Sequence, residues 1–485
     1  MQKSGVAFGT SGVRGLAIQM SDELCVAYTK AFLTHLKAIF QFDRVALGMD
    51  LRPSSPSIAA ACATGIFAEG LQVDFCGELP TPALALYAQN ENIPALMVTG
   101  SHIPFDRNGI KFYRPDGEIS KADELAITNS QVEFLSPLIT IDLPSVNQQA
   151  IALYEQRYVD FFTPNILAGL RLGLYEHSSV ARDVFRRILE KLGAQVISLD
   201  RTDMFVPIDT EAVAPEDIYR GQKWSAEYGF DAIISTDGDG DRPLMSDEAG
   251  YWLRGDMVGL LTSRYLRIKQ VAVPVSCNTA IELCCAFDAV IRTRIGSPYV
   301  IEAMQRFDSQ AGFIAGFEAN GGFLMGSRIE SNARFLDTLP TRDAVLPVLA
   351  VLAAAQEAGI KISALLQDLP QRFTASDRIP DFPAAVSKQL LEAWSENIML
   401  FSDLLYKQCG SVLTYDLSDG LRVTFEHQEI IHLRASGNAP ELRCYCEAST
   451  PERANELTQV VLSLIKNCEL LQTFANYLER TKNAL

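Results

Sequence analysis

Short apolar runs alternate with amphipathic stretches over the first three-quarters of the chain. The runs at 45–49, 71–75 and 95–98 have the composition of buried strands, and the stretches between them repeat apolar residues at helical spacing. This alternation is typical of α/β folds. The pattern begins again at 170–174 and at 271–275, which predicts three successive α/β domains.

The C-terminal quarter of the chain has a different pattern. Candidate strands at 421–425, 430–433 and 442–446 follow one another closely, and helices are expected from Ala384 and from Pro451. Closely spaced strands with flanking helices indicate an α+β domain with an antiparallel sheet.

The length of 485 residues agrees with this division, because domains of about 150 residues would give three or four of them. The expected domains span residues 1–147, 148–252, 253–369 and 370–485. The longest apolar run, Ala344–Ala355, is too short to cross a bilayer, and the N-terminus has no apolar signal stretch. We therefore expect a cytoplasmic protein with no membrane partner.

The formal net charge of −17 makes the surface acidic. Such a surface repels nucleic acid, so no nucleic-acid partner is expected. It would also repel a phosphorylated ligand, so any phosphate-binding motif must carry its own Arg or Lys residues.

Ten cysteines are scattered along the chain without a Cys-x-x-Cys pair. The nearest pairs are Cys284-Cys285 and Cys444-x-Cys446, and the second pair would share one face of a strand. Reduced, structural cysteines are expected rather than disulfides or a metal centre.

Three segments share one layout, in which an apolar strand runs into a polar loop that contains or adjoins glycine. They are 95–101, 231–237 and 312–318. Ligands of open α/β sheets bind beyond the carboxyl ends of strands. Three such ends directed at one cleft would build a single site.

The strongest chemical signal is Asp237-Gly-Asp-Gly-Asp-Arg242. Three carboxylates so close together repel one another unless a cation lies among them, and oxygen ligands favour Mg²⁺ or Ca²⁺. An EF-hand loop is the nearest alternative, because Glu248 fits its last ligand position. Arg242 replaces the glycine that such a loop requires, however, and the preceding segment reads as a strand. A solvated acidic turn is the remaining alternative.

The segment Thr99–Lys111 follows a predicted buried strand. Ser101 is expected at an exposed turn with His102 beside it, and Lys111 is expected to start the next strand. A serine nucleophile needs a base or an environment that accepts an anion. Taken alone, the segment fits a plain loop equally well, and no Gly-x-Ser-x-Gly motif indicates an acyl hydrolase.

Two further loops carry basic residues. The segment Arg434–Arg443 joins two predicted strands, and its backbone amides and guanidinium groups would form an anion site; the alternative is a polar hairpin with exposed arginines. The glycine-rich segment Phe8–Gly15 carries Arg14 but lacks the Lys-Ser/Thr ending of a nucleotide-binding P-loop.

Together these motifs resemble, in order and over nearly the whole chain, the α-D-phosphohexomutase family, which includes phosphoglucomutases and phosphomannomutases. The matching segments are 8–15, 99–111, 237–242, 316–322 and 434–443. The resemblance implies three related α/β domains with mixed sheets and a smaller C-terminal α+β domain, arranged around a central cleft.

The resemblance also implies how such a protein works. A phosphorylated Ser101 would exchange its phosphoryl group with a hexose phosphate through a hexose 1,6-bisphosphate, which also serves as activator. The implied catalytic residues are Arg14, Ser101, His102 and Lys111. One Mg²⁺ per chain would be held by Ser101, Asp237, Asp239 and Asp241. The implied substrate-binding residues are Arg242, Glu318, Asn320, Arg434, Ser436, Gly437, Asn438 and Arg443.

The sequence departs from the family pattern where the sugar is recognised. Asn320 and Gly322 replace the serine and histidine of the usual Glu-x-Ser-Gly-His, and Gly322 removes both bulk and a hydrogen-bond donor. Ile103 stands where asparagine is usual, and Asn438 replaces a common threonine. The groups implied in phosphoryl transfer are all present.

The expected activity is interconversion of hexose 6-phosphate and hexose 1-phosphate, with mannose favoured over glucose. A phosphoglucomutase of the same family is the first alternative. A sugar-phosphate phosphatase that uses the same serine and metal is the second, and a catalytically silent sensor is the third. The expected assembly is a monomer or weak homodimer.

Overall fold

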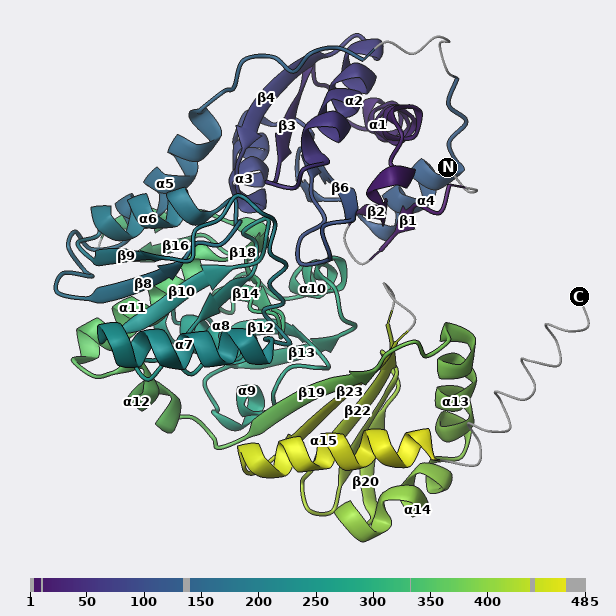
Figure 1. Ribbon diagram of the computed structural model, residues 1–485, viewed down its shortest axis with the longest axis vertical. Coiled ribbons are helices and arrows are strands. Elements are labelled where there is room, and N and C mark those ends of the chain that lie inside the picture. Colours follow the sequence, from purple (N-terminus) through teal and green to yellow (C-terminus); the bar gives the residue numbers. More distant parts are fainter. Residues whose placement is uncertain (1–3, 10–11, 134–139, 332, 437–440, 468–485) are drawn as a thin grey trace, which may run out of the picture. The chain divides into compact units, whose positions relative to one another are not determined.

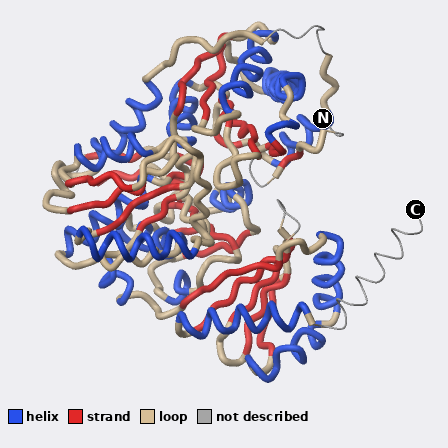
Figure 2. The backbone as a smooth tube through the Cα atoms, in the orientation of Figure 1, coloured by secondary structure: helices blue, strands red, loops and turns tan. Residues whose placement is uncertain are grey.

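The computed structural model describes residues 4–9, 12–133, 140–331, 333–436 and 441–467 (Figures 1 and 2). Gly437 and Asn438 of the predicted anion site lie outside these residues. Within the described part of the chain, no helix is long and apolar enough to cross a membrane.

The chain forms two compact units. The first unit comprises Met1–Ala272 and Gly296–Asp368, and the second comprises Val273–Ile295 and Leu369–Leu485. A short piece from the middle of the chain therefore belongs with the C-terminal part. Each unit is described by itself below.

The first sheet of unit 1 is mixed, in the order β1-β2-β6-β5-β3-β4 with β7 paired to β6. Its strands are β1 (Ala7–Phe8), β2 (Val13–Leu16), β3 (Arg44–Met49), β4 (Gln72–Glu78), β5 (Ala95–Val98), β6 (Arg107–Arg114) and β7 (Gly117–Glu118). Strands β3, β4 and β5 run parallel, and β6 pairs antiparallel with β5 and β2. Every residue of β3 after Arg44 is buried, as expected of a strand covered on both faces.

The helices of this first domain follow the predicted alternation. They are α1 (Asp22–Lys37), α2 (Ser55–Ala68), α3 (Thr81–Glu91) and α4 (Lys121–Asn129), with a short 3₁₀ turn η1 at Ala17–Gln19. Helices α1 and α2 pack on each other, and α2 and α3 both contact β3 and β5. Helix α1 begins after Ser21, whose side chain accepts a hydrogen bond from Leu24 N.

The second domain has a smaller sheet in the order β11-β10-β8-β9. Its elements are α5 (Gln149–Phe161), β8 (Arg171–Tyr175), α6 (Arg182–Lys191), β9 (Gln195–Leu199), α7 (Pro215–Tyr228), β10 (Ala232–Thr236) and β11 (Pro243–Met245). Strand β10 is buried along its whole length and ends directly before Asp237. The predicted acidic loop therefore starts at the carboxyl end of a central strand.

The third domain is a mixed sheet in which β12, β14, β15 and β18 pair in that order. Its elements in unit 1 are α8 (Gly255–Tyr265), β12 (Gln270–Pro274), α10 (Ser297–Met304), β14 (Ile314–Phe317), β15 (Phe323–Met325), β16 (Ile329–Ser331), β17 (Arg334–Leu336), β18 (Leu339–Asp343), α11 (Val345–Ala358) and α12 (Ile362–Gln367). The long apolar run is the buried helix α11, and Pro347 lies in its first turn, where no intrahelical donor is lost.

Unit 2 carries an antiparallel sheet in the order β19-β23-β22-β21-β20, as predicted for an α+β domain. Its elements are α9 (Ala280–Leu283), β13 (Ala289–Thr293), β19 (Phe373–Ile379), α13 (Ala384–Glu396), α14 (Ile398–Cys409), β20 (Val412–Asp416), β21 (Leu421–Phe425), β22 (Ile430–Ala435), β23 (Leu442–Ala448) and α15 (Pro451–Lys466). Helix α15 packs along β19 and β23 (Figure 2). The core of this unit includes Trp394, Phe401 and Phe425.

The described cysteines are all free. Cys444 and Cys446 lie on one face of β23, with their Sγ atoms 3.6 Å apart, and both are buried. The expected structural role of this pair agrees with its position in the core of unit 2.

Candidate active site

Ser101 lies just beyond the carboxyl end of β5, but it is not exposed as the sequence led us to expect. Its side chain is fully buried, and its φ of +55° lies in the left-handed region. The loop after β10 covers it, since a Cβ at Gly238 would lie only 2.9 Å from Ser101 O. Glycine at 238 therefore permits the acidic loop to close over the serine.

Arg52 holds the backbone of the serine loop. Its Nη2 donates to the carbonyl oxygens of Ser101 (2.7 Å) and Ile103 (2.6 Å). Its Nη1 donates to those of Pro104 (2.7 Å) and Arg107 (2.9 Å). One fully buried guanidinium thus donates to four carbonyl groups of the serine loop.

A second contact fixes the amide of the serine. Thr99 Oγ1 accepts a hydrogen bond from Ser101 N (2.8 Å) and donates one to Asp50 Oδ2 (2.7 Å). Asp50 also pairs with Arg52 at 3.2 Å. The sequence did not identify Asp50 or Arg52, because an Asp-x-Arg after a strand has no distinctive chemistry until its contacts are known.

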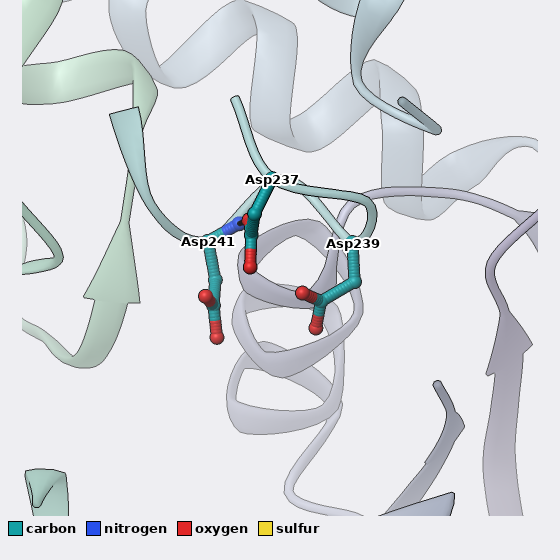
Figure 3. Close-up of side chains that lie close together, drawn as sticks. All are labelled: Asp237, Asp239 and Asp241. Carbon is teal, nitrogen blue, oxygen red and sulfur yellow. Dashed lines mark hydrogen bonds between the residues drawn. The ribbon is translucent and has the colours of Figure 1, made fainter. Parts of the chain in front are cut away.

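The three predicted aspartates converge. Figure 3 shows Asp237, Asp239 and Asp241 projecting from one loop to the same side, and one carboxylate oxygen from each lies within 4.8 Å of the others. Asp237 Oδ1 accepts from the backbone N–H groups of Asp241 and Arg242, both at 3.2 Å. Asp237 Oδ2 accepts from Ser101 Oγ at 2.5 Å.

The other two carboxylates are each anchored through a single oxygen. Asp239 Oδ2 accepts from Thr81 Oγ1 (2.6 Å) and Lys111 Nζ (2.6 Å), and Asp241 Oδ2 accepts from Lys111 Nζ (2.5 Å). The Oδ1 atoms of Asp239 and Asp241 are buried with no hydrogen-bond partner in the described part of the chain. Buried acceptors are rarely left unpaired, so these oxygens fit a hard cation such as Mg²⁺.

The titration of the cluster also fits a cation. Burial, followed by repulsion from Asp239 and Asp241, raises the pKa of Asp237 well above its usual value. Burial opposes ionisation of Asp239 as well, but the nearby Lys111 charge and its hydrogen bond hold the pKa of that carboxyl below its usual value. A divalent cation among the oxygens would offset the repulsion that contributes to the raised pKa of Asp237.

Lys111 lies in the middle of β6 rather than at the start of a strand. The strand extends back to Arg107 because β2 and β5 pair with it on both sides. This position buries the Lys111 side chain and directs its ammonium group at Asp239 and Asp241.

Arg14, on β2, has a guanidinium group that makes no hydrogen bond within the described part of the chain. Its Nε, Nη1 and Nη2 atoms are all buried, and none has a hydrogen-bond partner among the described residues. Burial and the nearby Arg242 lower the pKa of Arg14 to about 10. A buried guanidinium whose nitrogens make no hydrogen bond is costly, and this arrangement has the chemistry to accept an anion.

Arg242 and His102 meet beside the acidic loop. Arg242 Nη1 lies 2.8 Å from His102 Nδ1, which must accept because guanidinium nitrogens only donate. Arg242 Nε lies 3.8 Å from Asp237 and 3.6 Å from Asp241. Its charge is therefore near both the carboxylates and the serine loop.

Glu318 and Asn320 follow β14, as predicted. Glu318 is buried, and Asn320 Oδ1 accepts from Gly322 N at 3.0 Å. The backbone oxygen of Asn320 accepts from Thr210 Oγ1 at 2.7 Å. The side-chain oxygen and the backbone oxygen of Asn320 thus both hold the loop in place.

Arg342 occupies the space beside Gly322, where the sequence had indicated only a loss of bulk and of a hydrogen-bond donor. A Cβ at Gly322 would lie 2.5 Å from Arg342 Cδ. The Arg342 guanidinium donates to Asp241 Oδ2 and lies 3.2 Å from Glu318 Oε2. Burial opposes its charge, but Asp241 and Glu318 hold the pKa of Arg342 well above its usual value.

The predicted distal anion site belongs to unit 2. Arg434 on β22 lies directly opposite Arg443 on β23. Asp419 Oδ1 accepts from Arg434 Nε at 3.0 Å, and Ser436 N donates to Glu441 O at 2.9 Å. Like charges directly opposite on neighbouring strands are unfavourable, and here Asp419 lies 3.0 Å from Arg434 and Glu441 lies 3.7 Å from Arg443.

Comparison with known proteins agrees with the fold. Four domain families described as phosphoglucomutase/phosphomannomutase match the chain: α/β/α domain I at residues 5–133, domain II at 155–250, domain III at 254–373 and the C-terminal domain at 389–463. The chain belongs to the phosphoglucomutase/phosphomannomutase family, and the four matches follow the family's domain order.

Two of the similar proteins over nearly the full length of the chain are phosphomannomutases. The chain is 47% identical to a phosphomannomutase of Salmonella muenchen over 96% of its length and 97% of the relative. It is 42% identical to a phosphomannomutase of Sinorhizobium fredii over 96% and 99%. A putative phosphomannomutase structure from Thermus thermophilus has the same fold, with a TM-score of 0.75, 19% identity and coverage of 96% and 99%.

Proposed function

We propose that this protein is a Mg²⁺-dependent phosphohexomutase that interconverts hexose 6-phosphate and hexose 1-phosphate, with mannose as the preferred sugar. The observation that carries the proposal is the contact of Ser101 Oγ with Asp237 inside a cluster of three buried carboxylates. A nucleophile beside hard metal ligands and unpaired arginine nitrogens suits phosphoryl transfer, which needs charge neutralisation and exact placement.

In the proposed reaction, phosphorylated Ser101 transfers its phosphoryl group to the free hydroxyl of a hexose monophosphate. The bond between phosphorus and Ser101 Oγ breaks while a bond to the hydroxyl oxygen forms, giving a 1,6-bisphosphate. The sugar then turns end for end and returns its other phosphoryl group to Ser101. A Mg²⁺ ion held by Asp237, Asp239 and Asp241 supplies neutralisation of charge on the phosphoryl oxygens.

The chain's own cations have distinct roles in this scheme. Arg14 and Arg242 bind the phosphoryl oxygens, and His102 orients Arg242 through its Nδ1 atom. Lys111 moves the proton from the attacking hydroxyl to the departing Ser101 oxygen. Its contacts with Asp239 and Asp241 fix the ammonium group beside the reacting atoms.

The non-reacting phosphate is assigned to the anion site of unit 2. Arg434 and Arg443 supply two adjacent guanidinium groups, and Ser436 supplies a hydroxyl. Gly437 and Asn438 are proposed as further ligands from the same loop. A phosphate held at this end orients either sugar hydroxyl for reaction, and a trace of hexose 1,6-bisphosphate would serve as activator by phosphorylating Ser101.

The proposed sugar rests on the relatives. Two full-length relatives at 47% and 42% identity are named phosphomannomutases, whereas relatives named phosphoglucosamine mutase are 27–31% identical. Glu318 provides a carboxylate for adjacent sugar hydroxyls. The free thiols of the described cysteines support a reducing compartment such as the cytoplasm, and we propose a monomer or weak homodimer there.

The deciding experiment incubates the protein with a hexose 1-phosphate, Mg²⁺ and a catalytic amount of glucose 1,6-bisphosphate. A mutase produces hexose 6-phosphate with no free phosphate and depends on the bisphosphate. A phosphatase releases inorganic phosphate without it, and a sensor binds the sugar phosphate without turnover. If inorganic phosphate is the main product, the protein is a phosphatase and the mutase proposal is wrong.

A further inference from the structure

Arg342 at the end of β18 connects two loops that the sequence analysis treated separately. Its Nε and Nη2 atoms donate to Asp241 Oδ2 at 3.1 and 2.9 Å. Its Nη1 atom donates to Glu318 Oε2 at 3.2 Å and to Ser297 Oγ at 3.4 Å. One planar guanidinium therefore holds a predicted metal ligand and the predicted sugar carboxylate at once.

The surroundings of Arg342 fix this bridge. Its side chain is only 2% exposed, so neither carboxylate can turn to water without breaking a charged contact. The next residue, Asp343, accepts hydrogen bonds from Tyr154 OH at 2.5 Å and from Tyr158 OH. Those bonds hold the end of β18, and with it the starting point of the Arg342 side chain.

Gly322 makes the path of Arg342 possible. A Cβ there would lie 2.5 and 2.6 Å from Arg342 Cδ and Cγ, which is closer than real side chains approach. The φ of Gly322 is not in the left-handed region, so the close approach of Arg342, rather than backbone strain, explains the glycine. Even one added methyl group would push the guanidinium away from Glu318 or Asp241.

We propose that Arg342 is a positioning residue that couples metal binding to hexose recognition, by orienting Asp241 for the metal and Glu318 for the sugar. The inference rests on the proposed phosphohexomutase function. Arg342 holds Oδ2 of Asp241, which leaves Oδ1, an atom with no hydrogen-bond partner among the described residues, available to a metal. Loss of the bridge should therefore weaken metal binding and sugar binding together.

The test compares Arg342→Met, Arg342→Lys and Gly322→Ala with the unaltered protein. Arg328→Met is the matched control, because Arg328 is 60% exposed and pairs with Asp337 away from the site. Calorimetry gives the Mn²⁺ dissociation constant without sugar, kinetics give KM and kcat for mannose 1-phosphate, and thermal melting reports folding.

For Arg342→Met we expect Mn²⁺ affinity to fall about 10- to 100-fold, the range typical for residues that orient metal ligands, and KM to rise by a similar factor. Arg342→Lys should recover part of the Mn²⁺ affinity, because an ammonium group still faces Asp241, while KM stays high because one point charge cannot bridge both carboxylates. Gly322→Ala keeps the guanidinium but displaces it, so both quantities should shift in the same direction.

Unchanged Mn²⁺ affinity and KM in folded Arg342→Met would overturn the inference. A lower melting temperature with unchanged Mn²⁺ affinity and unchanged KM would also overturn the inference, since Arg342 would then only stabilise the fold. An unaltered protein that binds Mn²⁺ but turns over no hexose phosphate contradicts the proposed function instead. The metal arm of the experiment still decides the role of Arg342 in that case.

Discussion

Ser101 Oγ donates a hydrogen bond to Asp237 Oδ2 at 2.5 Å, across 136 residues of sequence. The contact places a hydroxyl from the first α/β domain directly on a carboxylate from the second. Both groups are fully buried, so the hydrogen bond is not exchanged with water. The serine and the acidic loop therefore form one site, and each is expected to depend on the other.

Ser101→Ala tests the nucleophile. The purified protein should carry partial phosphorylation at Ser101, because a phosphate of about −1.5 to −2 charge is offset there by the metal and by nearby arginines. The alanine variant should lose several orders of magnitude in kcat while its melting temperature changes little. Mass spectrometry of the intact protein measures the phosphorylation, and a mutase assay measures kcat. Undiminished mutase activity in this variant would exclude Ser101 as the phosphoryl carrier.

Asp239→Asn tests the metal site. The amide keeps the shape of the side chain but removes a charge that Lys111 and Thr81 hold in place. We expect a steep fall in activity that is partly restored at high Mg²⁺ concentration. Asp203→Asn is the control, because that side chain is 98% exposed. Full activity of the unaltered protein in excess chelator would show that no metal is needed.

Arg443→Ala tests the distal phosphate site. Loss of a charge-assisted contact costs about 1.5–3 kcal/mol, so kcat/KM for hexose phosphates should fall roughly ten- to a hundredfold. Lys388→Ala, an exposed position on α13 of the same unit, should have no effect. Equal kinetics for both variants would mean that the 434–443 loop is a plain turn.

The sugar preference is tested by kcat/KM for mannose 1-phosphate and glucose 1-phosphate. We expect the mannose value to be larger, and a tenfold larger value for glucose would overturn the assignment. Glu318→Ala should abolish turnover of both sugars, because a carboxylate that binds hydroxyls common to both does not depend on the configuration at C2. If the variant loses turnover of only one sugar, Glu318 instead contacts the hydroxyl at C2, where the two sugars differ.

Two buried histidines are expected to make the folded protein less stable at acidic pH. Nε2 of His177 donates to Thr236 O and Nε2 of His432 donates to Asp419 O, while both Nδ1 atoms are buried without a partner among the described residues. Burial lowers the pKa of each to about 4. In the unfolded chain these two histidines take up protons as the pH falls below about 6.5, whereas in the folded chain they stay neutral. Above pH 6.5 they therefore do not lower the free energy of unfolding. The free energy of unfolding decreases as the pH falls from 6.5 towards 4, by up to about 1.4 kcal/mol per pH unit for each histidine.

Thermal melting between pH 7.5 and pH 4.5 measures this effect. His177→Gln and His432→Gln should each show a shallower fall in melting temperature, since glutamine can donate the same hydrogen bond and takes up no proton. His427→Gln, at an exposed position, should keep the original slope. A fall that is identical in all of these proteins would assign the acid sensitivity to other groups.

Much of the fold could be predicted because its signals are local. The apolar run at 45–49 is strand β3, and the strand expected at 421–425 is β21 with the same bounds. The acidic loop was recognised for the same reason, since its three carboxylates are neighbours in sequence. The family resemblance then supplied the roles of residues whose local pattern is ordinary, such as Lys111.

The rest of the site depends on contacts between distant segments. Arg52 and Arg342 carry no local motif, and each acquires a role only when folding places it against Ser101 or Asp241. Burial of Ser101 was missed because the covering residues come from another domain. The side chain packed against Gly322 could not be predicted for a related reason, because Arg342 belongs to a different strand.

The membership of Val273–Ile295 in unit 2 has a consequence for synthesis of the chain. Thr279 donates to Glu447, 168 residues later, and Ile295 N donates to Asp419 Oδ2, so this piece acquires its partners late. At ordinary ribosomal speed the wait is roughly ten to thirty seconds, during which Thr279 and Ile295 lack these hydrogen-bond partners. A protein cut before residue 369 would lack both partners, so the segment 273–295 is not expected to adopt its native contacts in residues 1–368 alone.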